Sequence, residues 1–399
     1  MNEHQLVPHI RFQGFADEWE NSILGKMVKF LNGRAYKQSE LLVEGKYPVL
    51  RVGNFYTNDS WYYSNLELPK SAYANKGDLL YTWSATFGPH IWNGNKVIYH
   101  YHIWKIELSS YLDKKFLLQL LIDDRAKLLI NTNGSTMIHL TKSEMERKII
   151  KVPQLSEQQK IGNLFAKLDQ LLDLQQQELD QLDLLKKTLL QNLFPAQGTK
   201  IPELRFQGFA DEWEKKRLKE ISKIVGGGTP DTKNCDYWDG DINWYSPTEI
   251  GNKPYVYSSN KKITKLGLKK SSAKIHPSDT TILFTSRAGI GDMAILKKPA
   301  ATNQGFQSIE LVNSTYPYFI YSYGFEIKRQ ANTLASGSTF LEISKKDMEK
   351  ITLNLPTLDE QQKIGTFLAK LDHLIELEQQ KLDKIKQVKK ALLQNMFVE

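Results

Sequence analysis

The sequence Glu157-Gln158-Gln159-Lys160-Ile161-Gly162 recurs unchanged as Glu360-Gln361-Gln362-Lys363-Ile364-Gly365. Each copy lies near the start of a segment that ends in Leu-Leu-Gln-Asn, then Leu or Met, then Phe, so the two segments cover about residues 155–194 and 358–397. The offset between them is 203 residues throughout, without a gap. Because self-similarity at a fixed offset indicates a repeated architecture, the chain consists of two related halves.

Apolar residues in both segments recur at intervals of three and four, which places them on one face of a helix. We predict two helices of about 38 residues, each about 57 Å long, that pack as an antiparallel coiled coil and act as a spacer. The stripe is interrupted at Gln175 and Glu378, and a polar residue in such a seam usually fixes register. The predicted packing residues are Ile161, Phe165, Leu168, Leu172, Leu182, Leu189, Ile364, Leu368, Leu371, Ile375, Ile385 and Leu392, and the stripe also contains Leu171, Leu185, Phe367, Leu374 and Val388.

A second block, Arg-Phe-Gln-Gly-Phe-Ala-Asp-Glu-Trp-Glu, occupies residues 11–20 and recurs at 205–214. Its offset of 194 leaves nine extra residues in the second half before the offset of 203 applies. Each half therefore has the order block, variable segment, long helix, and we expect a pseudo-twofold protein whose chain ends lie close together. The predicted domains are 1–153, 154–200 (first long helix and linker), 201–353 and 354–399 (second long helix).

The variable segments contain short strand-like runs separated by turn residues, together with helical patterns. This mixture predicts an α/β (α+β) fold for both halves. The expected strands are 47–52, 78–83, 96–99, 281–285 and 293–296, and residues 116–121 and 125–130 of the first half are expected to be helical.

Composition limits the class of protein. The net charge of +8 favours a polyanionic partner, although weakly. The single cysteine, Cys235, rules out an intrachain disulfide framework and a multi-cysteine metal site. No stretch approaches 18 apolar residues and the first residues lack an apolar run, so we expect no membrane helix, no signal peptide and a cytoplasmic protein.

In the second half, Thr285-Ser286-Arg287-Ala288-Gly289-Ile290-Gly291 follows a predicted strand. Glycines allow the backbone to approach a ligand, and the guanidinium of Arg287 suits a guanine edge or a phosphate. The amides of Asn303 and Gln304 suit adenine. Each motif alone also fits an ordinary hydrogen-bonded turn, and these alternatives stay open.

In the first half, residues 82–90 occupy the same place without an arginine. His100 and His102 are expected on one face of a strand; with no third ligand evident, polar contacts or plain exposure are favoured over a metal site. A Gly-Ser-Thr trio occurs at 134–136 and 337–339. It fits a phosphate cradle or a simple helix cap equally well.

Catalytic motifs are not found in the sequence. There is no Walker sequence, no glycine-rich dinucleotide loop opening a βαβ unit, and no nucleophile elbow. Two alternatives to a nucleic-acid reader stay open: a coiled-coil adaptor that binds only protein, and, with less support, a fused methyltransferase or nuclease.

Together, the repeated helix starts, the Arg-Phe-Gln-Gly-Phe blocks, Thr285 to Gly291 and the segment 302–306 resemble the specificity subunit (HsdS) of type I restriction–modification systems. The resemblance covers nearly the whole chain. It implies two target recognition domains with small curved sheets, each reading one half of a split double-stranded DNA site. The first variable domain departs most, because it lacks the Ser-Arg-Ala-Gly-Ile-Gly and Asn-Gln-Gly sequences.

The resemblance also implies partners. The long helices would set the gap between the half-sites and dock two methyltransferase subunits, and motor-nuclease subunits would join that core. S-adenosylmethionine and ATP with Mg would belong to those partners, so that this chain binds no cofactor and is not itself an enzyme. The expected DNA-binding residues are Arg51, Asn54, Thr82, Trp83, Ser84, Thr86, His100, Tyr101, His102, Ser135 and Thr136 in the first half, and Thr285, Ser286, Arg287, Gly289, Asn303, Gln304, Phe306, Ser338 and Thr339 in the second.

Overall fold

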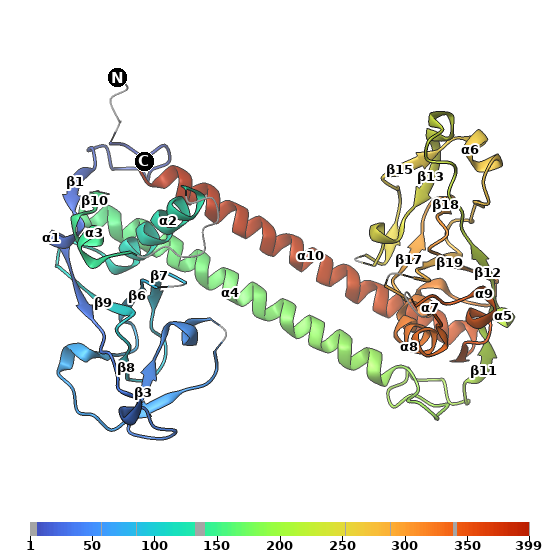
Figure 1. Cartoon of the computed structure of the whole chain (residues 1–399), viewed down its shortest axis with the longest axis horizontal. Helices are drawn as coiled ribbons and strands as arrows, with labels where there is room; N and C mark the ends of the chain where they lie inside the picture. Colours follow the sequence, from blue (N-terminus) through green and yellow to red (C-terminus); the bar gives the residue numbers. More distant parts are fainter. Residues whose placement is uncertain are drawn as a thin grey trace. The chain divides into compact units, whose positions relative to one another are not determined.

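A computed structural model describes residues 6–56, 58–84, 86–131, 140–251, 253–287, 289–337 and 341–398. The chain forms two compact units (Figure 1). The first unit comprises Met1–Gln176 and Gln380–Glu399, and the second comprises Gln177–Gln379. The long helices are α4, Leu155–Asn192, and α10, Leu358–Met396. Both begin where the repeat predicts and end within two residues of it, and each contributes one part to each unit.

The first unit contains two four-stranded sheets and a strand pair. One sheet is antiparallel, in the order β2-β9-β6-β7, and the other, β4-β3-β8-β5, contains the parallel pair β3 and β8. The strands are β1 Glu20–Ile23, β2 Val28–Asn32, β3 Tyr47–Leu50, β4 Tyr62–Ser64, β5 Tyr73–Ala74, β6 Leu79–Thr82, β7 Gly88–Ile91, β8 Val97–Tyr99, β9 Ile103–Leu108 and β10 Ile149–Val152. The helices are α1 Leu24–Met27, α2 Lys114–Asn131 and α3 Lys142–Arg147, with 3-10 turns η1 Gln38–Glu40, η2 Val52–Phe55 and η3 Lys70–Ala72.

The second unit repeats this plan with a five-stranded sheet, β12-β19-β16-β17-β14, a three-stranded sheet, β15-β13-β18, and the pair β11 and β20. Its strands are β11 Glu214–Arg217, β12 Ser222–Gly226, β13 Trp238–Tyr245, β14 Tyr255–Val256, β15 Lys261–Ile263, β16 Thr281–Phe284, β17 Met293–Leu296, β18 Ala300–Thr302, β19 Gln307–Leu311 and β20 Thr352–Leu355. Its helices are α5 Leu218–Ile221, α6 Lys265–Lys269, α7 Pro317–Ser322, α8 Gly324–Leu334 and α9 Lys345–Met348, with η4 Cys235–Tyr237 and η5 Pro247–Glu249. The mixed fold and all five predicted strands are confirmed.

The helical character expected for two runs of the first half is confirmed. Residues 116–121 and 125–130 are both helical, and they belong to a single helix, α2. The helix is continuous because no glycine or proline separates the two runs, and the pair Asp123–Lys127, at 2.8 Å, links residues four apart where the runs meet. The second unit does have two helices in this place, α7 and α8, which meet at Tyr323.

The core of each unit includes parts of both long helices. In the first unit, Phe165 of α4 lies 5.9 Å from Phe397, just beyond the end of α10, and Asp169 pairs with Lys389. Later residues of α4 thus meet earlier residues of α10, which makes the two segments antiparallel there. The backbone N–H of Ile10 donates to the carbonyl of Asn395 at 2.9 Å, so the two chain ends are neighbours, as predicted.

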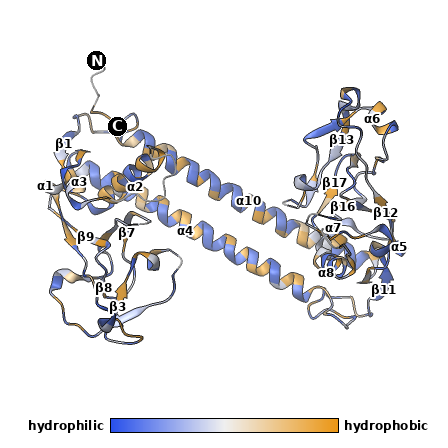
Figure 2. Ribbon diagram, viewed as in Figure 1, coloured by the Kyte–Doolittle hydropathy of each residue, from blue (hydrophilic) through white to orange (hydrophobic). Residues whose placement is uncertain are grey.

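The predicted packing residues lie mostly in these cores rather than only between the helices. Figure 2 shows hydrophobic residues spaced along both long helices between hydrophilic ones. Leu172 and Ile385 are half-buried and belong to neither core. Ile161, Phe165, Leu168 and Leu392 belong to the first-unit core, and Leu182, Leu189, Ile364, Leu368, Leu371 and Ile375 to the second-unit core.

The two repeated sequence blocks bind each other in both units. Arg11 donates to both carboxylate oxygens of Glu157 at 2.7 and 2.8 Å, and Arg205 donates to Glu360 at the same distances. Both glutamates are buried, so each carboxylate is neutralised by a bidentate guanidinium. The bond to Glu157 raises the pKa of Arg11 further above its usual range.

Other residues of the repeated Glu-Gln-Gln-Lys-Ile-Gly sequence make equally specific contacts. The Gln158 side chain accepts from the N–H of Asp113 at 2.9 Å and donates to the carbonyl of Pro153 at 2.8 Å. A methyl group on Gly162 would lie 2.7 Å from the backbone nitrogen of Phe116. Glycine therefore permits close approach of α2 to α4, and the equivalent Gly365 faces Tyr316 and Phe319. The recurrence of Glu-Gln-Gln-Lys-Ile-Gly thus reflects a repeated junction between the long helix and its unit.

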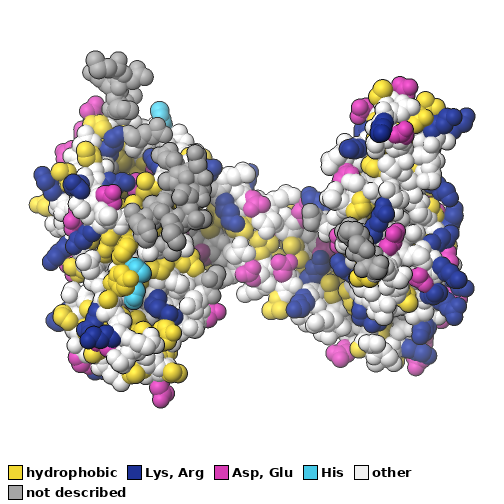
Figure 3. All heavy atoms as spheres, viewed as in Figure 1, with side chains coloured by type: hydrophobic (Ala, Val, Ile, Leu, Met, Phe, Trp, Pro, Cys, Tyr) yellow, Lys and Arg dark blue, Asp and Glu magenta, His cyan; other side chains and the backbone are white. Residues whose placement is uncertain are grey.

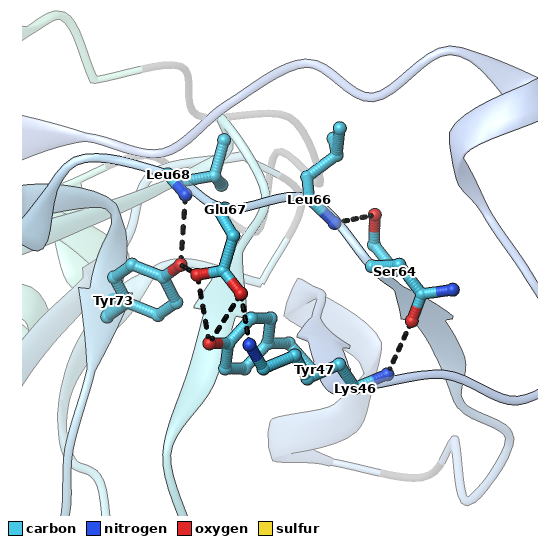
Figure 4. A network of polar contacts seen from close by, with 8 residues as sticks. Lys46, Tyr47, Ser64, Leu66, Glu67, Leu68 and Tyr73 are labelled. Atoms are coloured by element: carbon cyan, nitrogen blue, oxygen red, sulfur yellow. Dashed lines mark hydrogen bonds and ion pairs between the residues drawn. The ribbon is translucent and has the colours of Figure 1, made fainter.

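The sheet β4-β3-β8-β5 of the first unit carries a surface network of polar contacts (Figure 4). Glu67 pairs with Lys46 and accepts from the hydroxyls of Tyr47 at 3.2 Å and Tyr73 at 3.4 Å. The hydrogen bond from Lys46 is the main reason that the pKa of Glu67 is lowered. Because Tyr47 and Tyr73 belong to β3 and β5, the network fastens the loop after β4 to its own sheet.

No helix among the described residues combines the length and the apolar character that a membrane span requires.

Candidate nucleic-acid interface

Two loops lie side by side in each unit and form the candidate interface. The first loop joins β6 to β7, or β16 to β17, and the second joins β8 to β9, or β18 to β19. A threonine at the end of the strand closes the first loop in both units. The hydroxyl of Thr82 donates to the carbonyl of Thr86 at 2.9 Å, and that of Thr285 donates to the carbonyl of Gly289 at 2.6 Å.

The two loops are joined in the same way in both units. The N–H of Trp83 donates to the carbonyl of His102 at 3.1 Å, and the N–H of Ser286 donates to the carbonyl of Gly305 at 2.8 Å. The glycine that directly follows β2 in the first unit, or β12 in the second, lies against the backbone of the second loop. Any side chain at Gly33 would overlap the carbonyl of His100, and any side chain at Gly227 would overlap that of Asn303. The backbone frame of the candidate interface is therefore duplicated.

The second-unit loops present hydrogen-bonding groups. Arg287 is half-buried and pairs through its backbone with Glu342. Within the described residues its guanidinium has no hydrogen bond or ion pair, so its donors are available to a ligand. The carbonyl oxygen of the Asn303 side chain accepts from the N–H of Gly305 at 2.8 Å, and Gln304 is bonded to Thr229. A guanidinium beside two amides can bind base edges or phosphates.

The first-unit loops present aromatic and imidazole rings in place of the guanidinium and amide groups of the second unit. Tyr101 is 40% exposed, and its ring lies 4.3 Å from His100 and 3.9 Å from His102. Trp83 stacks on Trp104 at 5.8 Å, and its indole N–H donates to the carbonyl of Tyr101 at 2.9 Å. Figure 3 shows histidine side chains beside hydrophobic ones on this unit. The equivalent loops thus differ in chemistry while sharing a frame.

The expectation that His100 and His102 occupy one face of a strand is wrong. β8 ends at Tyr99, and residues 101–102 form the turn into β9. The chain turns there and passes from one sheet to another, since β8 and β9 belong to different sheets. Burial is the main cause that lowers the pKa of His100 to about 4, and the neighbouring His102 and Arg51 add to it. The described residues contain no group of three or more His, Cys, Asp or Glu side chains arranged to hold a metal ion.

Arg51 and Asn54 organise a neighbouring loop. The guanidinium of Arg51 lies 4.3 Å from the ring of Tyr62 and donates to the carbonyl of Ser60 at 3.1 Å. The Asn54 side chain accepts from the N–H of Arg51 at 3.0 Å and donates to the carbonyls of Asn58 and Ser60. Most of the hydrogen-bonding capacity of Asn54 is used within the loop itself.

The remaining predicted residues fall into three groups. Ser84 is half-buried, Thr86 is exposed, and Gly289 is exposed with a φ of 113° that favours glycine. Buried side chains belong to Thr82, Thr285, Ser286 and Phe306, which support the loops from within. Four predicted residues lie outside the described residues: Ser135, Thr136, Ser338 and Thr339.

Two histidines that support the loops, His276, which is buried, and His90, which is half-buried, were not found from the sequence. His276 is fully buried, with Nδ1 2.9 Å from Oε1 of Glu310 and Nε2 3.4 Å from the hydroxyl of Thr302. In the neutral form, Nδ1–H donates to Glu310 and Nε2 accepts from Thr302. Burial, the largest cause, lowers the pKa of His276 although the bond to Glu310 opposes this. Thr302 directly precedes Asn303, so His276 supports the second loop.

In the first unit, His90 occupies a comparable supporting position. Its ring stacks on Phe55 at 4.1 Å, and Nε2 lies 3.2 Å from the hydroxyl of Tyr56. Burial, followed by the charge of Arg125, lowers the pKa of His90 to about 4. A lone histidine carries no sequence motif, so only the tertiary structure reveals these roles.

The fold and the paired loops define a two-domain protein in which related α/β units share two long helices. The family model described as "Type I restriction modification DNA specificity domain" matches residues 16–184 and 210–387. The chain therefore belongs to this family and carries two copies of its domain. The resemblance to type I specificity subunits that the sequence suggests is confirmed.

Several relatives are similar over different lengths. The type I restriction enzyme MjaIX specificity subunit of Methanocaldococcus jannaschii is 37% identical over 193 residues, 47% of this chain and 44% of the relative. The EcoR124I/EcoR124II specificity subunit of Escherichia coli is 33% identical over 180 residues and 43% of each chain. The chain thus spans less than half the length of these two relatives. The MjaVIII specificity subunit of M. jannaschii is 24% identical over 94% of this chain and 91% of the relative.

Solved structures support the same fold. The type I restriction–modification S subunit from M. genitalium matches with a TM-score of 0.66 and 16% identity, covering 98% of this chain and 99% of the other. A second match comes from a solved structure that concerns complex assembly and conformational transition of the type I R-M system. Its TM-score is 0.55 with 17% identity, and the match covers 94% of this chain and 96% of the other.

Proposed function

We propose that this chain is the sequence-reading subunit of a type I restriction–modification complex, and that each unit reads one half of a split double-stranded DNA target. The observation that carries the proposal is the duplicated loop frame with different exposed side chains. A frame held by the same bonds in both units, yet presenting different chemistry, suits two readers of unlike half-sites. The net charge of +8 agrees with a polyanionic partner.

In the second unit, the proposed base contacts come from Arg287, Asn303 and Gln304. Their side chains lie on adjacent loops, and the free guanidinium of Arg287 matches a guanine edge in the major groove. Thr285, Ser286 and Phe306 are assigned a supporting role, because their side chains are buried. In the first unit, the accessible Tyr101, with Trp83, His100 and His102 beside it, is proposed to make ring and imidazole contacts with its half-site.

The long helices are proposed to dock two methyltransferase subunits, one at each repeated junction. Gln159, Lys160 and their counterparts Gln362 and Lys363 are exposed and identical in the two copies, as a surface used twice would be. Apolar side chains of the predicted stripe are also exposed on the helices. They include Leu171 at 43%, Leu185 at 47%, Phe367 at 39%, Leu374 at 42% and Val388 at 45%.

The chain itself is proposed to be non-catalytic. Methyl transfer with S-adenosylmethionine would belong to the methyltransferase subunits, and ATP with Mg to motor-nuclease subunits. The roles of this chain's residues are then to bind DNA, fix its register and hold the partners.

The length of α4 and α10 is proposed to set the spacer between the half-sites, because both helices continue from one unit into the other. Four residues inserted near Gln176 lengthen a helix by about 6 Å. At about 3.4 Å per base pair, the preferred spacer should grow by roughly one to two base pairs while the bases read stay the same. An unchanged spacer in a complex that still methylates DNA would contradict this proposal.

The function is tested by long-read methylation mapping in a host that carries this chain with its methyltransferase partner. The expected result is methylation at one split sequence with a spacer of fixed length. Methylation that is lost when the chain is deleted would assign the specificity to it. A reconstituted complex that prefers no DNA sequence would support the protein-only adaptor instead.

A further inference from the structure

The second unit contains a group of closely spaced lysines that the proposed base contacts do not explain. Between residues 250 and 278 there is no Asp or Glu. All six lysines of the lysine strip are exposed; the strip comprises Lys261, Lys262, Lys265, Lys269, Lys270 and Lys274. Figure 3 shows Lys and Arg side chains gathered along the edge of this unit over α6, β12 and α5.

The strip lies on an ordered element. Thr264 caps α6 by accepting from the N–H of Gly267 at 3.0 Å and donating to the carbonyl of Asp236 at 2.7 Å. A side chain at Gly267 would overlap the carbonyl of Tyr237, so α6 is packed closely against η4. The backbones of Lys265 and Lys269 are thus held in place, and a bound anion would not have to order them.

The charges of the strip are not neutralised within the unit. Among the described residues, none of the six lysines has an ion pair, and Lys261 lies over the ring of Trp238 at 5.7 Å. Within the described part of the chain, the strip also forms no ion pair with the nearby acids Asp236, Asp239 and Asp241. By contrast, Lys253 outside the strip pairs with Glu376 at 3.0 Å.

A simpler explanation covers only part of the strip. Lysines on an edge strand prevent pairing with another sheet, and β15 is the edge of its three-stranded sheet. This accounts for Lys261 and Lys262. It does not account for the four lysines on and after α6, which lie outside the strand.

The strip also adjoins the proposed reading loops. A side chain at Gly228 would overlap Ser272 and Ala273, which lie between Lys270 and Lys274 of the strip. The next residue, Thr229, is bonded to Gln304 of the second loop. A single segment of chain therefore separates the end of the strip from a proposed base contact.

We propose that the lysine strip binds the phosphates of the DNA backbone beside the second half-site, without reading sequence. The proposal rests on the proposed function. It makes the units unequal in this respect, since Tyr62 and Tyr63 of β4 stand where β15 has Lys261 and Lys262. The second unit would thus supply a backbone anchor that the equivalent part of the first unit lacks.

The test measures binding of the full chain to a random-sequence duplex at several salt concentrations. Each lysine–phosphate contact contributes about 0.9 to the slope of log affinity against log salt. The triple variant Lys265→Gln, Lys269→Gln, Lys270→Gln should flatten that slope by about two to three. Replacing the same residues with arginine should keep the slope of the unmodified chain.

A charge-matched control replaces three exposed lysines of the first unit, Lys26→Gln, Lys29→Gln and Lys37→Gln, and should change the slope by less than about one. An unchanged slope in the strip variant, or an equal change in the control, would overturn the proposal. Methylation mapping separates it from the proposed function. The strip variant should keep the methylated sequence, and a changed sequence would mean that the strip reads bases. A complex without any preferred sequence in the unmodified protein would defeat the proposed function alone.

Discussion

The junctions of the two units with the long helices are nearly identical, whereas the paired loops differ in every side chain that we assign to base contacts. Arg11 with Glu157 and Arg205 with Glu360 form the same bidentate pair at the same distances. In the loops, Tyr101 and its histidines stand where the second unit has Gln304 and its neighbours. The difference separates two roles: the repeated residues build and join the units, and the divergent ones determine what each unit binds.

The largest expected effect is loss of a junction ion pair. Arg205→Ala leaves the buried carboxylate of Glu360 without its partner and should destabilise the second unit by about 3–5 kcal/mol. Arg11→Ala is the matched change in the first unit and should cost a similar amount. Denaturant unfolding of each variant measures this. If the two junctions are equivalent, both variants should lose the same free energy of unfolding. A large loss for one variant and none for the other would contradict that equivalence.

Removing both partners separates the charge from the packing. The double variant Arg205→Met, Glu360→Leu eliminates the stranded carboxylate and should recover most of the lost stability. A double variant as unstable as Arg205→Ala would mean that shape, and not charge pairing, holds the junction.

The next effect concerns one loop only. Arg287→Ala removes a proposed bidentate base contact and should cost about 1–3 kcal/mol of discrimination at one position of the second unit's half-site. Tyr101→Ala is the comparison variant, since it alters the first unit's loop. Relaxed methylation in opposite halves of the target for these two variants is the expected result. Equal weakening on all DNA sequences would mark Arg287 as a phosphate contact.

The smallest expected effect is on pH dependence. The folded first unit keeps His90 and His100 neutral, with pKa values lowered to about 4 from an ordinary value of 6.5. Their contribution is therefore complete above about pH 6.5 and is lost as pH falls towards 4. After discounting for partial exposure, we expect a loss of about 1 kcal/mol.

Hydrogen exchange resolved by unit can measure this loss. Replacement of both histidines by glutamine should flatten the pH dependence of the first unit and leave that of the second unit unchanged. His276 is lowered in pKa as well, so the second unit keeps a dependence of its own. A first unit whose pH dependence is unaffected by the replacement would contradict the assignment.

The repeat predicted much of the fold, because helix periodicity and strand runs are local properties of the sequence. The bounds of α4 and α10, the predicted strands and the nearness of the chain ends are confirmed. The junction pairs were missed, although the sequence contained a signal. Arg11 and Glu157 recur as Arg205 and Glu360, and the recurrence of opposite charges in both repeated blocks could have suggested a contact.

The candidate site was less predictable because burial depends on tertiary packing. Phe306 and Ser286 belong to the motif that suggested DNA contact, yet both are buried. His100 and His102 have strand-like spacing, but the chain turns between two sheets at that point. His276 has no motif at all, and only the fold brings it to Thr302 and Glu310. The role of every predicted residue in DNA contact stays a prediction.

The central claim is that each unit reads its own half of the target. It is tested most directly by exchanging residues 21–153 for the equivalent segment of a relative with a different target and mapping the methylated sequence. The exchange keeps the first repeated block and the whole of α4, so the ion pair between Arg11 and Glu157 and the second unit are unchanged. The account predicts that one half of the methylated sequence is replaced while the other half and the spacer are retained. A change in both halves would show that the units do not read DNA independently and would contradict the account.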